Sequence, residues 1–165
     1  MLKALSLLIL LLASALSFAS DITASAHAKK SLQIYKTIIE IPTVAGRGKV
    51  PEMAAYLAKE LREAGFMPED LQIIPTGETA LFIARYQGNK KSQKKPILLL
   101  GHMDVVEALD KDWERPPFEL TQDDKYFYGR GTVDNKLGIA MLTSTFIRLK
   151  KAGFVPDRDI YLAFS

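Results

Sequence analysis

The sequence predicts one α/β domain in which a mixed sheet is flanked by helices. Its 165 residues are enough for a single domain with a substantial core, and a composition of 48% hydrophobic and 25% charged residues is that of a globular protein. Stretches with apolar residues at helical spacing alternate with short apolar runs that favour strands. Because this alternation is typical of layered α/β folds, we expect helices on both faces of the sheet.

Three helices are predicted from the spacing of apolar residues. Residues 31–41 carry apolar side chains three and four positions apart, and Pro42 ends this stretch. In the second helix Pro51 occupies a favoured first-turn position, and Gly65 follows the last turn. The third helix covers residues 135–152 and is also followed by a glycine.

Short apolar runs between these helices predict the strands. Residues 96–100 are suited to a strand that is buried on both faces of the sheet, and so are residues 159–164. In sheets of this kind, ligands bind at the carboxyl ends of the strands. The remaining strands are predicted at residues 71–74, 80–86 and, before a glycine turn, 126–128.

The first residues predict a targeting segment. Residues 1–19 combine a positive start, an apolar stretch and a small-residue cleavage pattern at Ala19, which is typical of a secretory signal peptide, and Ala26 offers a second cleavage position. The apolar stretch is shorter than the about 20 residues of a membrane-spanning helix, so we expect no stable membrane anchor after cleavage. We therefore expect an exported protein, periplasmic or secreted. A flexible segment at residues 20–30 would precede the domain at residues 31–165.

Composition and charge restrict the kinds of metal site and partner that this domain can have. The chain contains no cysteine, so a metal ion would be held by histidines and carboxylates. Its formal net charge is only +3. Four lysines gather in residues 90–95, where they form either a polyanion contact or a solvated loop. We favour the loop and expect no nucleic acid as a partner.

A histidine and an aspartate directly follow the strand at residues 96–100. In an extended chain, His102 and Asp104 point to the same side because they are two positions apart. An imidazole is a good zinc ligand, and a neighbouring carboxylate can fix its tautomer and raise its basicity. The alternative is a histidine bonded to a backbone carbonyl beside an aspartate that caps a turn. The four residues from Gly101 to Asp104 alone favour neither interpretation.

A second acidic turn lies in the sequence YGRGTVDNKLG, residues 128–138. Its glycines suggest a phosphate-binding loop, but Asp134 stands where a dinucleotide-binding motif has its third glycine, and a carboxylate would repel pyrophosphate. Taken alone, Asp134 is usually the amino-terminal cap of a helix. Arg130 and Lys136 either balance negative charge at a site or are simply solvated, and we favour this structural role over a chemical one. A second acidic turn after the first favours a shared site.

These motifs, in this order and at these separations, resemble the two-zinc exopeptidase family. GHMDVV is followed by Trp113, by Pro-Pro-Phe at residues 116–118 and by YGRGTVDNKLG. The family includes aminoacylases, acetylornithine deacetylases, succinyl-diaminopimelate desuccinylases, carnosinase-like dipeptidases and glutamate carboxypeptidases. The resemblance covers about residues 30–165. It implies the amino-terminal portion of a zinc-exopeptidase-like catalytic domain.

The resemblance also implies a zinc-dependent metallopeptidase or amidohydrolase that cleaves an amide bond with a metal-activated water. In the complete family site, which holds two zinc ions, His102 would bind one zinc ion and Asp134 would bridge both. Asp104 would be the catalytic residue that orients the His102 imidazole. A cis peptide bond would join Asp134 to Asn135. The substrate would be a peptide or an N-acyl amino acid, as in dipeptidases, carboxypeptidases and deacylases.

The sequence departs from the family pattern after residues 159–164. The family continues this strand into an acidic segment with two adjacent glutamates, one the general base and the other a zinc ligand, whereas this sequence ends at Ser165. The later ligands and the smaller domain that would support a homodimer are missing as well, so we expect a fragment that is inactive alone. The alternative is a non-catalytic exported binding or interaction fragment.

Overall fold

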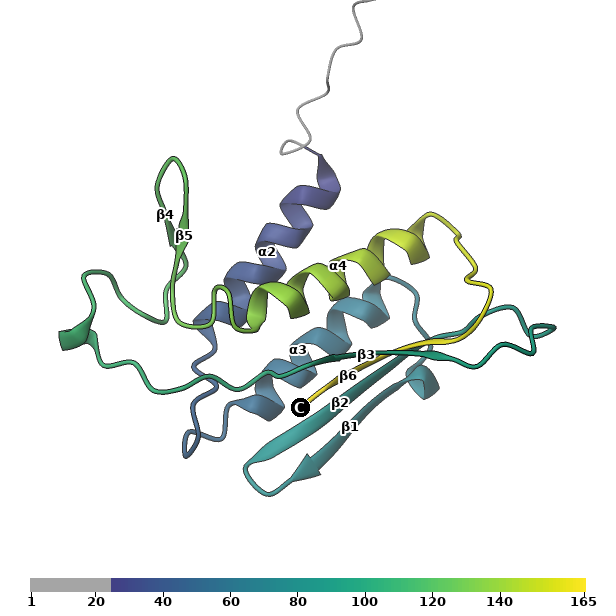
Figure 1. Cartoon of the computed structure of the whole chain (residues 1–165), viewed down its shortest axis with the longest axis horizontal. Helices are drawn as coiled ribbons and strands as arrows, with labels where there is room; N and C mark the ends of the chain where they lie inside the picture. Colours follow the sequence, from purple (N-terminus) through teal and green to yellow (C-terminus); the bar gives the residue numbers. More distant parts are fainter. Residues whose placement is uncertain (1–24) are drawn as a thin grey trace, which may run out of the picture.

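A four-stranded mixed sheet is the centre of the computed structural model, which describes residues 25–165 (Figure 1). β1 (Leu71–Thr76) and β2 (Thr79–Tyr86) form an antiparallel hairpin. β6 (Ile160–Phe164) pairs antiparallel with β2, and β3 (Ile97–Gly101) lies parallel to β6 at the edge of the sheet. The strand order is therefore β1, β2, β6, β3, and the predicted mixed sheet is confirmed.

Three helices pack together beside this sheet (Figure 1). They are α2 (Ala26–Glu40), α3 (Val50–Glu63) and α4 (Lys136–Lys151). α3 packs against β1 and β2, and α4 packs against both other helices. The α3 and α4 boundaries lie within one residue of the predicted ones, because the proline and the glycines that delimit them act locally.

Helices cover only one face of the sheet in the described part of the chain. Phe82, Leu162 and Phe164, on the face toward the helices, are 0% exposed. On the other face, Leu98 and Leu100 are 59% and 71% exposed. Our expectation of helices on both faces, with the strand at 96–100 buried on both sides, is therefore wrong for residues 25–165. An apolar run shows that a strand can be buried, but the elements that cover it are remote in sequence.

The amino-terminal helix begins earlier than predicted. α2 starts at Ala26, where the Ser25 side chain accepts a hydrogen bond of 3.1 Å from the Ala28 backbone amide and so caps the helix. Residues 26–30, which we expected to be flexible, are therefore helical. The predicted signal peptide at residues 1–19 lies outside the described residues. No helix within residues 25–165 is long and apolar enough to cross a membrane.

A small hairpin outside the main sheet leads into the second acidic turn. β5 (Phe127–Tyr128), which we predicted, pairs with β4 (Thr121–Gln122), which we did not. Asp123 holds the connection together by accepting hydrogen bonds from the backbone amides of the turn and from the Tyr128 hydroxyl. The Tyr128 hydroxyl contributes most to lowering the pKa of Asp123, to about 2. β4 was missed because Thr121 and Gln122 are polar and form no apolar run, unlike the aromatic residues 126–128.

A buried cation marks the start of α4. Lys136 is 0% exposed, and its Nζ donates a hydrogen bond of 2.7 Å to the Ile41 carbonyl oxygen. Burial lowers the pKa of Lys136 to about 7, since the charged form has lost its hydration. Our expectation of a solvated side chain is therefore wrong for Lys136, which has a structural role inside the domain.

The one-sided sheet leads to a prediction about two leucines. Leu162→Ala should lower the free energy of unfolding by about 2–5 kcal/mol, because it leaves a cavity between the sheet and the helices. Leu100→Ala, on the open face, should change it by only about 0.5 kcal/mol. Urea unfolding followed by circular dichroism measures both values. Equal losses would contradict the one-sided arrangement.

The buried lysine leads to a prediction about pH. Because its folded pKa is depressed below that of the unfolded chain, the unfolded state binds more protons between about pH 7 and 10.5. The free energy of unfolding should therefore rise with pH in this interval. Lys136→Met should remove that part of the rise, which urea unfolding of both proteins at pH 7 and pH 9 would show. An unchanged pH dependence in the variant would contradict the burial of this charge.

Candidate functional site

The carboxyl end of β3 presents the first two candidate residues. β3 ends at Gly101, and the chain continues beyond the sheet through His102, Met103 and Asp104. Met103 is fully buried, whereas the side chains of His102 and Asp104 are 40% and 62% exposed. The alternation expected from an extended chain therefore holds, and both polar side chains emerge on the accessible side.

The His102 imidazole lies between two carboxylates. Its Nδ1 is 3.1 Å from Asp104 Oδ1 and 3.1 Å from the Asp104 carbonyl oxygen. Its Nε2 is 2.8 Å from Asp134 Oδ1. The fold thus brings together the three residues that the sequence analysis singled out, although Asp134 is 32 positions away from His102.

The surrounding charges favour the protonated form of His102. Hydrogen bonding to the Asp134 carboxylate raises the pKa of His102 most strongly, burial opposes this effect, and the Asp104 carbonyl and carboxylate add to it. Two carboxylates within hydrogen-bonding distance of one imidazole form a cluster rich in negative charge. Such a cluster attracts cations, whether a proton or a metal ion.

Glycines allow the two turns to approach one another. Gly131 has φ +84°, and a Cβ atom there would lie 2.8 Å from Val105 Cγ1. A Cβ atom on Gly101 would lie 3.1 Å from Asn135 Oδ1. Both glycines are therefore explained by close packing between the two turns and need no bound phosphate. The peptide bond between Asp134 and Asn135 is cis, as the resemblance implies.

Arg130 supports the loop that precedes the second turn. Its guanidinium lies 5.1 Å from the centre of the Trp113 ring and donates a hydrogen bond of 3.4 Å to the Glu107 carbonyl oxygen. These contacts hold the loop in place, and they agree with the structural role that we favoured for Arg130. Trp113 contributes to the same packing.

Thr43 is a residue near the site that the sequence analysis missed. It is 0% exposed, and its hydroxyl donates a hydrogen bond of 2.6 Å to the carbonyl oxygen of Met103, between His102 and Asp104. The sequence signal was limited to Pro42, which we interpreted only as the end of a helix. A threonine after a proline does not reveal a contact 60 positions away.

The donors of the cluster fit part of a zinc site. An imidazole nitrogen and a carboxylate oxygen are both zinc ligands, and His102 Nε2 and Asp134 Oδ1 are close enough to share one ion. Asp104, at the other ring nitrogen, is placed as a partner that orients a ligating histidine. A catalytic zinc ion usually has three protein ligands. Among residues 25–165, no group of three or more histidine or carboxylate side chains converges as a metal site.

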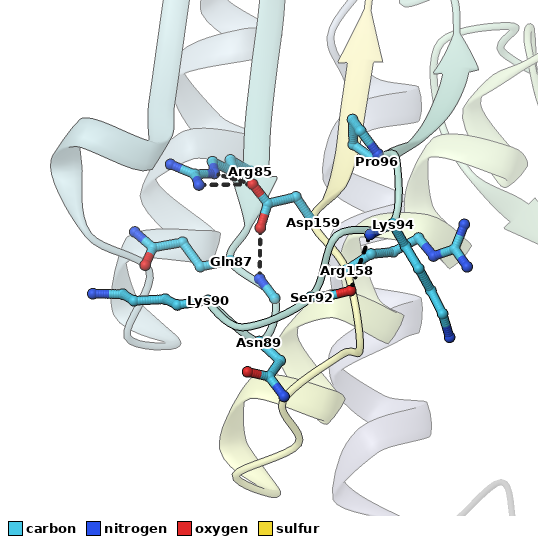
Figure 2. A pocket seen from close by; sticks show the side chains of 10 residues that line it. Arg85, Gln87, Asn89, Lys90, Ser92, Lys94, Pro96, Arg158 and Asp159 are labelled. Carbon is cyan, nitrogen blue, oxygen red and sulfur yellow. Dashed lines mark hydrogen bonds and ion pairs between the residues drawn. The ribbon is translucent and has the colours of Figure 1, made fainter.

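Two cavities differ in their relation to this cluster. One, of about 360 Å³, lies beside Asp104 and is lined also by Thr43 and Ser165. Another, of about 370 Å³, lies where β3 and β6 begin, at the opposite end of these strands (Figure 2). Its basic residues are Arg85, Lys90, Lys94 and Arg158.

The second cavity has an internal ion pair of its own. Arg85 Nη2 lies 2.7 Å from Asp159 Oδ2, and the Gly88 amide donates a hydrogen bond of 2.7 Å to Asp159 Oδ1 (Figure 2). The predicted lysine loop forms its rim, with Lys90 and Lys94 exposed to solvent. This cavity is therefore separate from the His102 cluster.

Comparison with known proteins places these motifs in a family. Residues 98–165 match the model of peptidase family M20/M25/M40. Over 136 residues the chain is 49% identical to a probable succinyl-diaminopimelate desuccinylase of Staphylococcus aureus, which covers 81% of this chain and 31% of that protein. An acetylornithine deacetylase of Buchnera aphidicola is 29% identical over 138 residues, covering 79% of this chain and 34% of that protein. The chain thus spans about a third of the length of these relatives.

Solved structures share the fold. Human carnosine dipeptidase 1 matches with a TM-score of 0.70 and 21% identity, over 84% of this chain and 32% of that one. The dipeptidase Dug1p of Saccharomyces cerevisiae matches with the same TM-score and 22% identity, also over 84% of this chain and 32% of that one. From these motifs, the family match and the shared fold, we conclude that the chain belongs to peptidase family M20/M25/M40, of which it carries part of the domain.

Proposed function

We propose that the chain carries part of the active site of a zinc-dependent metallopeptidase or amidohydrolase. The observation that carries this proposal is the contact of 2.8 Å between His102 Nε2 and Asp134 Oδ1, with Asp104 at the other ring nitrogen. This arrangement would supply a nitrogen ligand, an oxygen ligand and an orienting acid beside the carboxyl end of β3. Relatives named as a desuccinylase and a deacetylase support hydrolysis of an amide bond.

Each of the three residues has a separate role in this proposal. His102 would provide a neutral imidazole nitrogen to hold zinc, and Asp134 would provide carboxylate oxygens. Asp104 holds the His102 ring and fixes the nitrogen that carries the proton. When bound, two zinc ions polarise the amide carbonyl and lower the pKa of a water molecule.

A second candidate for the isolated chain is a non-catalytic exported binding or interaction fragment, and the ligand count supports its non-catalytic character. The specific observation is that His102 and Asp134 make only two ligands, and that no group of three donors forms in residues 25–165. A water-activating zinc ion usually has three protein ligands, and a separate base accepts the proton. The chain alone is therefore proposed to bind zinc weakly and to hydrolyse no amide.

Substrate, location and assembly are part of the same proposal. The substrate is a peptide or an N-acyl amino acid, in keeping with relatives that are named for deacylation and structures that are named for dipeptide cleavage. The amino-terminal sequence supports export to the periplasm or the exterior. A homodimer would require a further domain of the kind expected from the resemblance.

Substitution of the ligands leads to a prediction about zinc binding. His102→Ala and Asp134→Ala should each abolish measurable zinc binding, because a single remaining ligand holds the ion too weakly. Asp104→Asn should weaken binding by about 10- to 100-fold, since it removes a partner of a ligating histidine. Isothermal titration calorimetry with zinc chloride measures the zinc affinity of the three variants and of the parent.

Asp124→Asn is the matched control, because it removes an exposed carboxylate from the β4–β5 turn and should leave the affinity unchanged. Zinc binding by His102→Ala that equals binding by the parent would exclude the proposed site. Hydrolysis of a dipeptide by the parent chain with zinc would instead refute the non-catalytic candidate.

A further inference from the structure

A short buried segment joins the two turns that carry the proposed ligands. Residues 41–44 connect the end of α2 to the loop before α3. Ile41, Thr43 and Val44 are all buried, at 8%, 0% and 7% exposure. The segment is not part of the main sheet, so its backbone groups can bond to neighbouring turns.

The first set of contacts reaches the His102 turn. The Thr43 hydroxyl donates a hydrogen bond of 2.6 Å to the Met103 carbonyl oxygen. The Val105 amide donates a hydrogen bond of 3.1 Å to the Thr43 carbonyl oxygen, and Val44 forms an isolated parallel bridge with Val105. One residue, Thr43, therefore bonds on both sides of Asp104.

The second set of contacts reaches the Asp134 turn. Lys136 Nζ donates a hydrogen bond of 2.7 Å to the Ile41 carbonyl oxygen from a fully buried position. The Lys136 amide donates a hydrogen bond of 3.1 Å to the Gly131 carbonyl oxygen and so closes the turn that contains Asp134. The same side chain thus attaches the turn to residues 41–44.

The direct contact between the proposed ligands is too exposed to fix their spacing. His102 and Asp134 are 40% and 82% exposed, and ion pairs in such positions add little stability. The buried hydrogen bonds of Thr43 and Lys136 are better suited to this task, because breaking them leaves polar groups without water. A shift of about 1 Å in a ligand is enough to weaken a site of this kind.

We propose that residues 41–44 form a strut between the two ligand turns, with Thr43 and Lys136 as positioning residues for His102 and Asp134. The inference rests on the proposed function for its effect on zinc. The strut itself is a property of the protein without metal. Loosening either of its ends should therefore loosen both turns.

Hydrogen exchange of the intact chain, resolved by NMR, tests the strut. Thr43→Val, which removes the hydroxyl and keeps the shape, should speed exchange of the Val105 amide about fivefold, while amides of α3 stay unchanged. Thr43→Ser should restore slow exchange. Lys136→Met should also speed exchange at Val105, although the Lys136 side chain donates its hydrogen bond to the other end of the strut.

Thr143→Val is the matched control. Thr143 is also 0% exposed, and its hydroxyl has no hydrogen-bond partner among residues 25–165, so the substitution should leave the Val105 amide unchanged. Faster exchange throughout the chain in Thr43→Val, or an effect of Lys136→Met confined to residues 131–136, would overturn the inference. Either result would show that Thr43 and Lys136 stabilise the protein without coupling the two turns.

Zinc titration of the same proteins separates this inference from the proposed function. If the parent binds zinc, Thr43→Val should bind it about tenfold more weakly, and Thr143→Val should bind it like the parent. Equal zinc affinity of Thr43→Val and the parent would overturn the positioning role. If the parent binds no zinc, the proposed metal site fails, and the exchange data alone decide whether the strut exists.

Discussion

The parallel pairing of β3 with β6 is the constraint on which the site depends. Gly101 lies opposite Phe164, and the pairing extends past the strand because the Ser165 amide bonds to the Gly101 carbonyl oxygen at 3.1 Å. The Met103 amide then bonds to the Ser165 carbonyl oxygen. His102 is therefore held on both sides by backbone contacts with a strand that is remote in sequence. A slip of one residue would turn it into the core and bring Met103 to the surface.

Burial and exposure are divided sharply at this edge of the sheet. Met103, Thr43 and Lys136 are fully buried, while the carboxylates of Asp104 and Asp134 are accessible. The accessible groups can exchange protons or bind an ion, since solvent reaches them. The buried groups cannot move without losing hydrogen bonds that water does not replace. In residues 102–104, rigid support and accessible chemistry thus come from alternate residues, since Met103 is buried between two accessible side chains.

One face of the sheet is exposed although the side chains of β3 on that face are apolar. Leu98 and Leu100 alternate with Leu99, which packs against the core, so β3 is apolar on both faces but covered on one. Its aliphatic sequence led us to expect burial on both sides. Apolar side chains indicate that a strand can be buried. Whether both of its faces are covered depends on which other elements pack against the sheet. That information is not contained in the strand.

The sequence by itself determined most of the elements and the three residues of the proposed site. Local rules begin α3 with a proline in its first turn and end it before a glycine, and they put His102 and Asp104 on one side of an extended chain. The motif order indicated the family and Asp134. Tertiary structure alone decided that Asp134 lies 2.8 Å from His102, and that Thr43 and Lys136 join their turns. These contacts span from 32 to 95 positions, and they exist only because packing of the helices on the sheet brings remote segments together.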